Sequence, residues 1–166
     1  MSVVCCKISE KTIEVAADSI SIRGYTQSKG KDDYSKLVEI NGMIVGCVGR
    51  AEESSLLQMF CATRTPESAS EGAILTFFTE FMDWKKKRTE KYKTENRFIF
   101  VFTGKAFYVE GFFIREIKSY EAIGAGMNFG LSALYLGHSA AKAVETACEL
   151  SIFCEQPIQI LKATRQ

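Results

Sequence analysis

A serine at position 2 is the first residue whose type and place could do chemistry. The stretch behind it, residues 3–17, has the β-branched and apolar composition of two short strands and ends at Asp18. A hydroxyl at the start of a chain is either a tolerated second residue or a nucleophile waiting for Met1 to be removed. In the second case it could attack a carbonyl carbon and form an ester.

The cysteines and the single histidine offer a second kind of chemistry. The six cysteines stand in apolar surroundings without paired CxxC spacing, and only His138 could join them around a metal. We therefore expect no zinc site, no other metal and no cofactor. In a reducing compartment cysteine behaves as a small buried hydrophobe, so core packing is predicted rather than disulfides or a thiol nucleophile. His138 is interpreted as a capping or surface residue.

Composition limits the partners. The chain has 166 residues, of which 46% are hydrophobic and 25% charged, with a formal net charge of +1. This predicts a single globular domain over residues 1–166, without the field that would attract nucleic acid or an anionic membrane. Its apolar runs are shorter than the roughly 20 residues that cross a bilayer, and the first residues lack the pattern of a signal peptide. A cytoplasmic location follows as the expectation.

Two hairpins are expected before residue 50. Residues 3–17 are rich in β-formers on both sides of the turn-forming "SEK", so the N-terminus is predicted to be built into a sheet. Residues 36–49 predict a second hairpin around Asn41 and Gly42. The polar stretch 19–35 between them is interpreted as a loop or a mobile hairpin.

Helices and further strands follow. Two helices are predicted in residues 51–63 and 67–88, the second with apolar residues at three- and four-residue spacing: Ile74, Phe77, Phe78, Phe81 and Trp84. Residues 97–126 read as a strand series, residues 127–151 as two short helices with small residues on their faces, and residues 152–162 as an edge strand. This order favours an α+β, four-layer αββα sandwich, with two sheets face to face and a helix pair on each outer face.

Several strings in this order carry a resemblance. Asp18 stands in "VAADS", Lys36 begins "KLVEINGMIVGCVG", and "YEAIGAG" opens a helix. With Ser2 in front of them, the chain resembles the proteasome β-subunit family, which are N-terminal nucleophile hydrolases, and most closely the bacterial branch typified by HslV. The resemblance covers nearly the whole chain and implies the four-layer fold of those hydrolases.

The resemblance makes Ser2 the nucleophile where the family usually has threonine. The chemistry needs the hydroxyl on residue one, because the freed α-amine of that residue serves as the general base. While Met1 remains, the Ser2 nitrogen is an amide without useful basicity. Loss of the threonine methyl leaves the side chain freer at χ1, so a slower nucleophile is expected.

The resemblance also assigns the supporting residues. Lys36 matches the family lysine, whose buried ammonium lowers the pKa of the hydroxyl and the amine. Asp18 matches the aspartate that keeps this lysine charged and oriented. The turn at Gly49 and Arg50 falls where the family provides a backbone N–H as oxyanion donor, and either of the two N–H groups could point inward.

Two positions depart from the family pattern. The family commonly has a serine between two glycines, and Ala125 stands there in this chain. Near the C-terminus the family usually has an acid at the end of a helix, and the alignment places Ser151 there, with Glu149 on a different face. A proton-shuttling hydroxyl and a supporting acid are therefore expected to be missing.

The function that the resemblance implies is a threonine-type endopeptidase with a serine nucleophile that cleaves unfolded polypeptides. Family members form hexameric or heptameric rings stacked in pairs, and the HslV branch works with a ring ATPase that unfolds substrate, so a homo-oligomer and an ATPase partner are implied. Val45, Cys47 and Val48 suggest a small apolar substrate pocket, and Tyr25 and Tyr34 could line the cleft entrance.

Two other functions stay open. A ring subunit without peptidase activity is favoured by Ala125 and Ser151, and opposed by the intact Asp18 and Lys36, because a buried charged pair is costly to desolvate. An N-terminal nucleophile amidase for small molecules also remains, because the fold alone does not fix the substrate. The oligomer would discriminate, since a barrel indicates polypeptides and a dimer indicates small amides.

Overall fold

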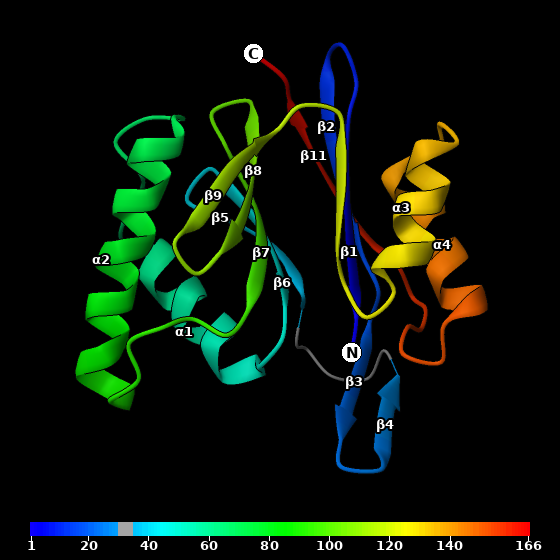
Figure 1. The fold of residues 1–166 in the computed structure, drawn as a ribbon, viewed down its shortest axis with the longest axis horizontal. Helices are drawn as coiled ribbons and strands as arrows, with labels where there is room; N and C mark the ends of the chain where they lie inside the picture. The colour runs from blue at the N-terminus through cyan, green and yellow to red at the C-terminus, as the bar shows by residue number, and fades with distance from the viewer. Residues whose placement is uncertain (30–34) are drawn as a thin grey trace.

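The computed structural model, which describes residues 1–29 and 35–166, has four layers (Figure 1). Two antiparallel sheets face each other, and a pair of helices covers the outer face of each. The helices of the described residues are α1 (Ala51–Cys61) and α2 (Glu71–Thr89) on one side, and α3 (Met127–Tyr135) and α4 (Ala140–Leu150) on the other. The predicted αββα sandwich is confirmed.

The first sheet contains the start of the chain. Its strands, in spatial order, are β10 (Tyr120–Gly124), β1 (Val3–Ile8), β2 (Thr12–Ala17) and β11 (Gln159–Thr164). Strands β1 and β2 form the predicted hairpin, with Val4 opposite Ala17. Strand β11 lies at the edge, as predicted for the end of the chain. The N-terminus is thus held in the middle of a sheet.

The second sheet is a run of hairpins. Its strands are β5 (Leu37–Ile40), β6 (Met43–Val48), β7 (Arg97–Phe102), β8 (Lys105–Glu110) and β9 (Phe113–Ile117). The turn between β5 and β6 is the predicted one, and Asn41 and Gly42 both have positive φ, of 51° and 75°. Two left-handed residues give the turn whose twist matches the flanking strands.

The polar stretch after Asp18 begins with a separate two-stranded hairpin. Strands β3 (Ile20–Arg23) and β4 (Thr26–Lys29) pair with each other and project beyond the sandwich at the end where the chain begins (Figure 1). Tyr25 lies fully exposed at its tip. Tyr34, which was expected at the cleft entrance, lies outside the described residues.

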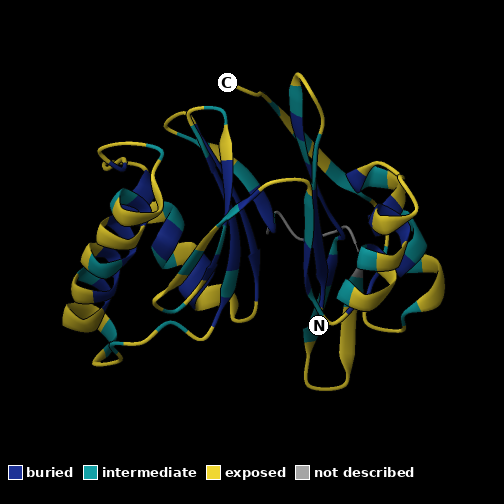
Figure 2. Ribbon diagram, turned by 45° about the horizontal axis from the view of Figure 1, so that its top comes forward, coloured by how far each residue is buried: buried dark blue, intermediate teal, exposed yellow. Residues whose placement is uncertain are grey.

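Three apolar cores hold the layers together, and buried residues lie along both sheets and the inner faces of the helices (Figure 2). The core under α1 and α2 is aromatic, and Phe78 contacts the rings of four other phenylalanines. The core under α3 and α4 is built from small residues, because the helices lie close to the sheet. A Cβ at Gly130 would lie 2.7 Å from the Cys5 Sγ.

The cysteines pack as predicted. Five of the six are buried and Cys148 is half-buried, and all are free thiols. Burial raises the pKa of Cys6 and of Cys47 to about 12, which keeps these thiols protonated and unreactive. In the part of the chain that the structure describes, no helix is long and apolar enough to cross a membrane.

Candidate active site

Ser2 directly precedes β1 in the chain, and the turn after β10 holds its backbone. Its side chain and backbone are only 4% exposed, and its carbonyl oxygen accepts a hydrogen bond of 3.1 Å from the Gly126 N–H. Gly124 has a φ of +99°, and a Cβ there would lie 2.3 Å from the same carbonyl oxygen. Gly124 therefore lets this turn approach Ser2 at a distance that a larger residue would not allow, and the Gly126 N–H binds the Ser2 backbone.

Asp18 is fully buried just after β2, and its carboxylate is saturated with donors. One oxygen accepts from the Val3 N–H at 2.9 Å and from the Lys36 ammonium at 2.9 Å. The other accepts from the N–H groups of Ile20 at 3.2 Å and Glu155 at 3.3 Å. Three of these four donors are backbone groups from separate segments, so the carboxylate also fixes the chain directly after Ser2.

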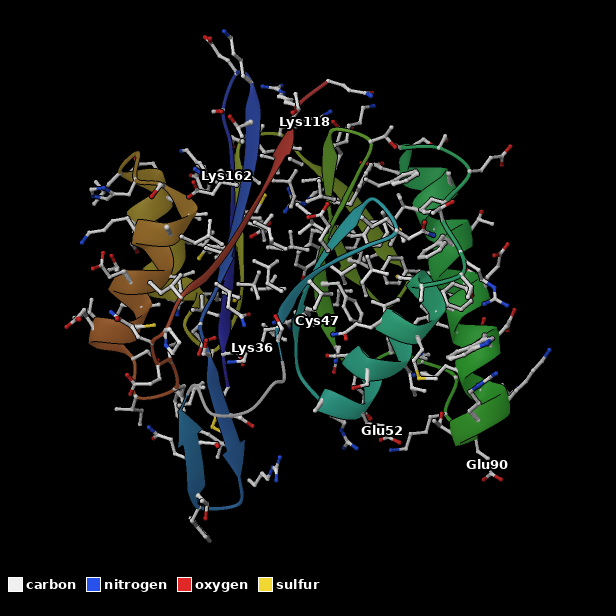
Figure 3. All side chains as sticks on the ribbon, turned by 180° about the vertical axis from the view of Figure 1, so that it is seen from behind. Lys36, Cys47, Glu52, Glu90, Lys118 and Lys162 are labelled. Carbon is white, nitrogen blue, oxygen red and sulfur yellow. The ribbon has the colours of Figure 1, made fainter. Side chains whose placement is uncertain are left out.

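Lys36 directly precedes β5, in the sheet that faces the sheet of β2 and Asp18. Figure 3 shows its side chain at the base of the β3–β4 hairpin. The ion pair is 2.9 Å long, with the lysine side chain 7% and the aspartate side chain 0% exposed. Burial lowers the pKa of Lys36 below its ordinary value, while the charge of Asp18 opposes that shift. The ammonium is thus a nearly dry charge that, within the described residues, pairs with the Asp18 carboxylate.

One open cleft brings several predicted residues together. It has a volume of about 500 Å³, and Ser2, Lys36, Gly49 and Arg50 all line it. The remaining walls come from the hairpin strand and from the start of α1: Ile20, Ser21, Ile22, Ala51 and Glu52, together with Met1. The cleft is large enough for a peptide segment, and its mouth carries charges of both signs.

At the turn of Gly49 and Arg50, one of the two backbone N–H groups is already bonded within the protein. Gly49 has a φ of +128°, a conformation that other residues rarely adopt. The Arg50 N–H already donates to the Asn96 Oδ1 at 2.7 Å. No acceptor among the described residues is found for the Gly49 N–H. Of the two donors considered from the sequence, Gly49 is the one left available.

The two departing positions occupy different places. Ala125 is exposed in the turn between Gly124 and Gly126, beside the backbone of Ser2, and brings no hydroxyl there. Ser151 ends α4, where its Oγ accepts from the Phe153 N–H at 3.2 Å. Ser151 is not among the residues that line the cleft. Its hydroxyl serves the turn after the helix.

Met1 lies against the Ser2 hydroxyl. It is 55% exposed and lines the cleft, and the Ser2 hydroxyl contacts the Met1 carbonyl oxygen. With Met1 in place, the Ser2 nitrogen is part of a peptide bond and its hydroxyl is engaged by that bond's own oxygen.

The predicted apolar pocket is wrong. Val45 and Cys47 point away from the cleft into the aromatic core under α1 and α2, and Figure 3 shows Cys47 on the α1 side of β6. Val48 packs in the core between the sheets. The alternation of side chains along β6 sends these residues to two cores, a register that the sequence did not fix.

Two contributors were missed by sequence reasoning. Asn96 holds the Arg50 backbone, and Glu52 lines the cleft. Asn96 precedes a strand and Glu52 stands in the first turn of a helix, and both are ordinary places for these residue types. No local signal distinguishes them. The described residues contain no cluster of side chains that could hold a metal.

Solved structures with this arrangement of layers are proteasome-type N-terminal nucleophile hydrolases. BPH of Thiobacillus denitrificans, a proteasome-like protein solved in complex with epoxomicin, matches with a TM-score of 0.89 and 17% identity over 99% of both chains. HslV from Trypanosoma brucei matches with a TM-score of 0.72 and 16% identity over 98% of this chain and 99% of that one. Anbu (ancestral beta-subunit) from Yersinia bercovieri matches with a TM-score of 0.71 and 14% identity over 96% of this chain and 80% of that one.

The chain therefore has the fold of the proteasome-type N-terminal nucleophile hydrolases, and the resemblance noted in the sequence is confirmed at the level of the fold. At these identities the likeness concerns the backbone and not the chemistry. No protein-family model and no curated protein matches the sequence.

Proposed function

We propose that this chain is the subunit of a proteasome-type endopeptidase in which Ser2 is the nucleophile once Met1 is removed. The observation that carries the proposal is the meeting of Ser2, Lys36 and Gly49 in one cleft. A hydroxyl, a buried cation that acidifies it and a free backbone donor are the parts that acyl transfer needs. The fold supports the same kind of enzyme.

The first half of the reaction forms an ester. The freed α-amine of Ser2 takes the hydroxyl proton while Oγ attacks the carbonyl carbon of a peptide bond. The C–N bond breaks and the amine passes the proton to the leaving nitrogen. The Lys36 ammonium, held by Asp18, favours the negatively charged oxygen of Ser2, and the Gly49 N–H donates to the oxyanion.

The second half returns the enzyme. Water gives a proton to the same amine and attacks the ester carbon, and the bond between that carbon and Oγ breaks as the proton returns to Oγ. A buried Lys36 serves both halves without giving up its own proton. Removal of Met1 is the step that creates the base, because it converts an amide nitrogen into an amine.

The substrate and assembly form part of the proposal. We infer unfolded polypeptide as substrate, a homo-oligomeric ring that is hexameric or heptameric and stacked in pairs, a ring ATPase as partner, and a cytoplasmic location. Large apolar side chains are exposed on α3, directly after it, at the end of α4 and after that end, and their exposure supports an assembly in which partner chains cover them: Phe129, Tyr135, Leu136, Leu150, Ile152 and Phe153.

A peptidase assay tests the proposal. Met1-free protein is incubated with unfolded casein and with fluorogenic peptides, beside the variants Ser2→Ala, Lys36→Met and Lys142→Met. Hydrolysis is expected for the parent, with a loss of at least about 100-fold in the first two variants and no loss in the third, whose lysine is an exposed surface residue. Equal rates in the parent and Ser2→Ala would reject the proposal.

A second candidate is a ring subunit that keeps the fold without activity. The observation that favours it is Ala125, which leaves the turn beside the Ser2 backbone without a hydroxyl. Met1-free protein that assembles into rings and cleaves none of these substrates would support this function instead.

A further inference from the structure

A buried polar network lies behind the Gly49 turn, and Asn96 is its point of contact with the turn. Asn96 is 1% exposed and directly precedes β7. Its Oδ1 accepts from the Arg50 N–H at 2.7 Å, and its Nδ2 donates to the Arg50 carbonyl oxygen at 2.9 Å. One side chain thus binds both backbone polar groups of Arg50, which holds the peptide groups on either side of this residue.

Asn96 can bind Arg50 in this way only because Gly49 has no side chain. A Cβ on Gly49 would lie 2.1 Å from the Asn96 Oδ1 and 2.6 Å from its Cγ. The amide side chain therefore fills the space that any other residue at position 49 would need. Because Asn96 occupies the Arg50 N–H, the neighbouring Gly49 N–H is the donor that remains for the cleft.

Asn96 is itself held from two sides. Its Nδ2 donates to the Ser54 Oγ at 3.0 Å. One carboxylate oxygen of Glu53 accepts the Asn96 N–H at 2.8 Å and the Glu95 N–H at 2.9 Å. Helix α1, which follows the turn, thus supplies the residues that fix the segment carrying Asn96.

The other oxygen of Glu53 joins a second helix to this network. It lies 2.6 Å from the Lys85 ammonium, and both side chains are at most 8% exposed. Lys85 also donates to the Lys93 carbonyl oxygen at 2.7 Å. A buried ion pair is expensive to desolvate, and the two side chains of this pair also bind backbone groups of residues 93–96: two N–H groups and one carbonyl oxygen.

We propose that Asn96 is the positioning residue of the oxyanion turn: it binds the backbone of Arg50 so that the Gly49 N–H alone faces the reacting carbonyl. The inference rests on the proposed peptidase function. Asn96 does not line the cleft and acts through the backbone of its neighbours. Without it the donor is still present but no longer held in direction, and misaligned donors lose most of their effect on the transition state.

The test uses Met1-free full-length protein with Asn96→Ala, Asn96→Asp and the control Glu95→Gln. Glu95 pairs with the Arg50 side chain at 2.8 Å, but both side chains are more than half exposed, so the control perturbs the same turn without touching its backbone bonds. Asn96→Asp keeps an acceptor for the Arg50 N–H and removes the donor. Amide hydrogen exchange resolved to single residues and steady-state peptidase kinetics are measured for each.

In the parent, the Arg50 amide is expected to exchange at least about tenfold more slowly than the Gly49 amide. Asn96→Ala is expected to remove that protection and to lower kcat by about 100-fold with KM changed by less than about threefold. Asn96→Asp is expected to keep part of the Arg50 amide protection and part of kcat, and Glu95→Gln is expected to equal the parent in both quantities. Because partial unfolding would also lower the apparent kcat at constant KM, kcat is calculated per folded chain, with the folded fraction taken from the protection of core amides in the same exchange experiment.

Equal exchange of the Gly49 and Arg50 amides in the parent overturns the proposal, even if Asn96→Ala does not fold. Unchanged kcat in a folded Asn96→Ala also overturns it. If the parent hydrolyses no peptide, the peptidase function fails and the catalytic use of the turn fails with it, whereas slow exchange at Arg50 would still identify the clamp as a structural one. The two failures are therefore told apart.

Discussion

Replacing Lys36 with methionine tests whether the burial of the Asp18–Lys36 ion pair, rather than its N–O distance, decides how much the pair stabilises the fold. Methionine keeps most of the aliphatic stem and removes the ammonium. The matched change is Lys142→Met, because Lys142 and Glu145 also form a Lys–carboxylate pair, 2.7 Å long, with side chains 54% and 41% exposed. By distance alone the exposed pair would be the stronger of the two.

The magnitude follows from what each carboxylate keeps. Asp18 is 0% exposed and cannot turn to water, but it retains three backbone donors after Lys36 is gone. Removing one partner of a buried pair costs roughly 3–5 kcal/mol, and the remaining donors place this case near 3 kcal/mol. Glu145 is rehydrated at once, so Lys142→Met is expected to cost less than about 1 kcal/mol.

The assay is urea unfolding at one fixed protein concentration, followed by the fluorescence of Trp84, the single tryptophan. Its ring stacks on Phe81 at a centroid distance of 6.4 Å, so its emission reports the packing of α2. The slope of the free energy of unfolding against urea should stay constant, since neither change alters the buried surface much. Equal losses in the two variants, or a gain in stability for Lys36→Met, would show that burial does not decide how much each ion pair stabilises the protein.

Three further predictions concern packing and pH. Gly124→Ala should cost at least about 2 kcal/mol more than Gly111→Ala in the same urea assay, because both have positive φ but only Gly124 would also clash, with the carbonyl oxygen of residue 2. Phe78→Ala should cost about 3–5 kcal/mol, and the exposed Phe113→Ala less than about 1 kcal/mol. Burial raises the pKa of Cys6 from 9.0 to about 12. The contribution of its protonated thiol to the free energy of unfolding is therefore complete below pH 9 and is lost as the pH rises toward 12. Cys6→Ala should therefore lose up to about 2 kcal/mol less than the parent between pH 8 and pH 10.5, and equal slopes would contradict this.

Much of the fold could be predicted because the local signals agree with the final structure. The alternation and turn residues of residues 3–17 indicate the first hairpin, Asn41 and Gly42 indicate the second, and the apolar spacing around Phe78 indicates α2. The order of these elements is enough to arrange the layers. The β3–β4 hairpin remained ambiguous because its strands are short and polar and pair only with each other.

The candidate site was only partly predictable. Asp18 and Lys36 could be singled out from the resemblance, and they form a buried ion pair. The direction of side chains along β6 depends on a register that the sequence leaves open, and Cys47 lies in the aromatic core. Asn96 could not be found, because its role comes from contacts with a turn 46 positions away in the chain. Long-range hydrogen bonds of single polar residues leave no periodic pattern.

The most direct measurement of the central claim is the intact mass of the purified protein before and after incubation with epoxomicin, a peptide epoxyketone. We expect the parent to lack Met1 and to gain the mass of one inhibitor per chain, with the adduct mapped to Ser2 and absent in Lys36→Met. A Met1-free, folded parent that gains no mass at any inhibitor concentration would contradict the claim that Ser2 is a nucleophile.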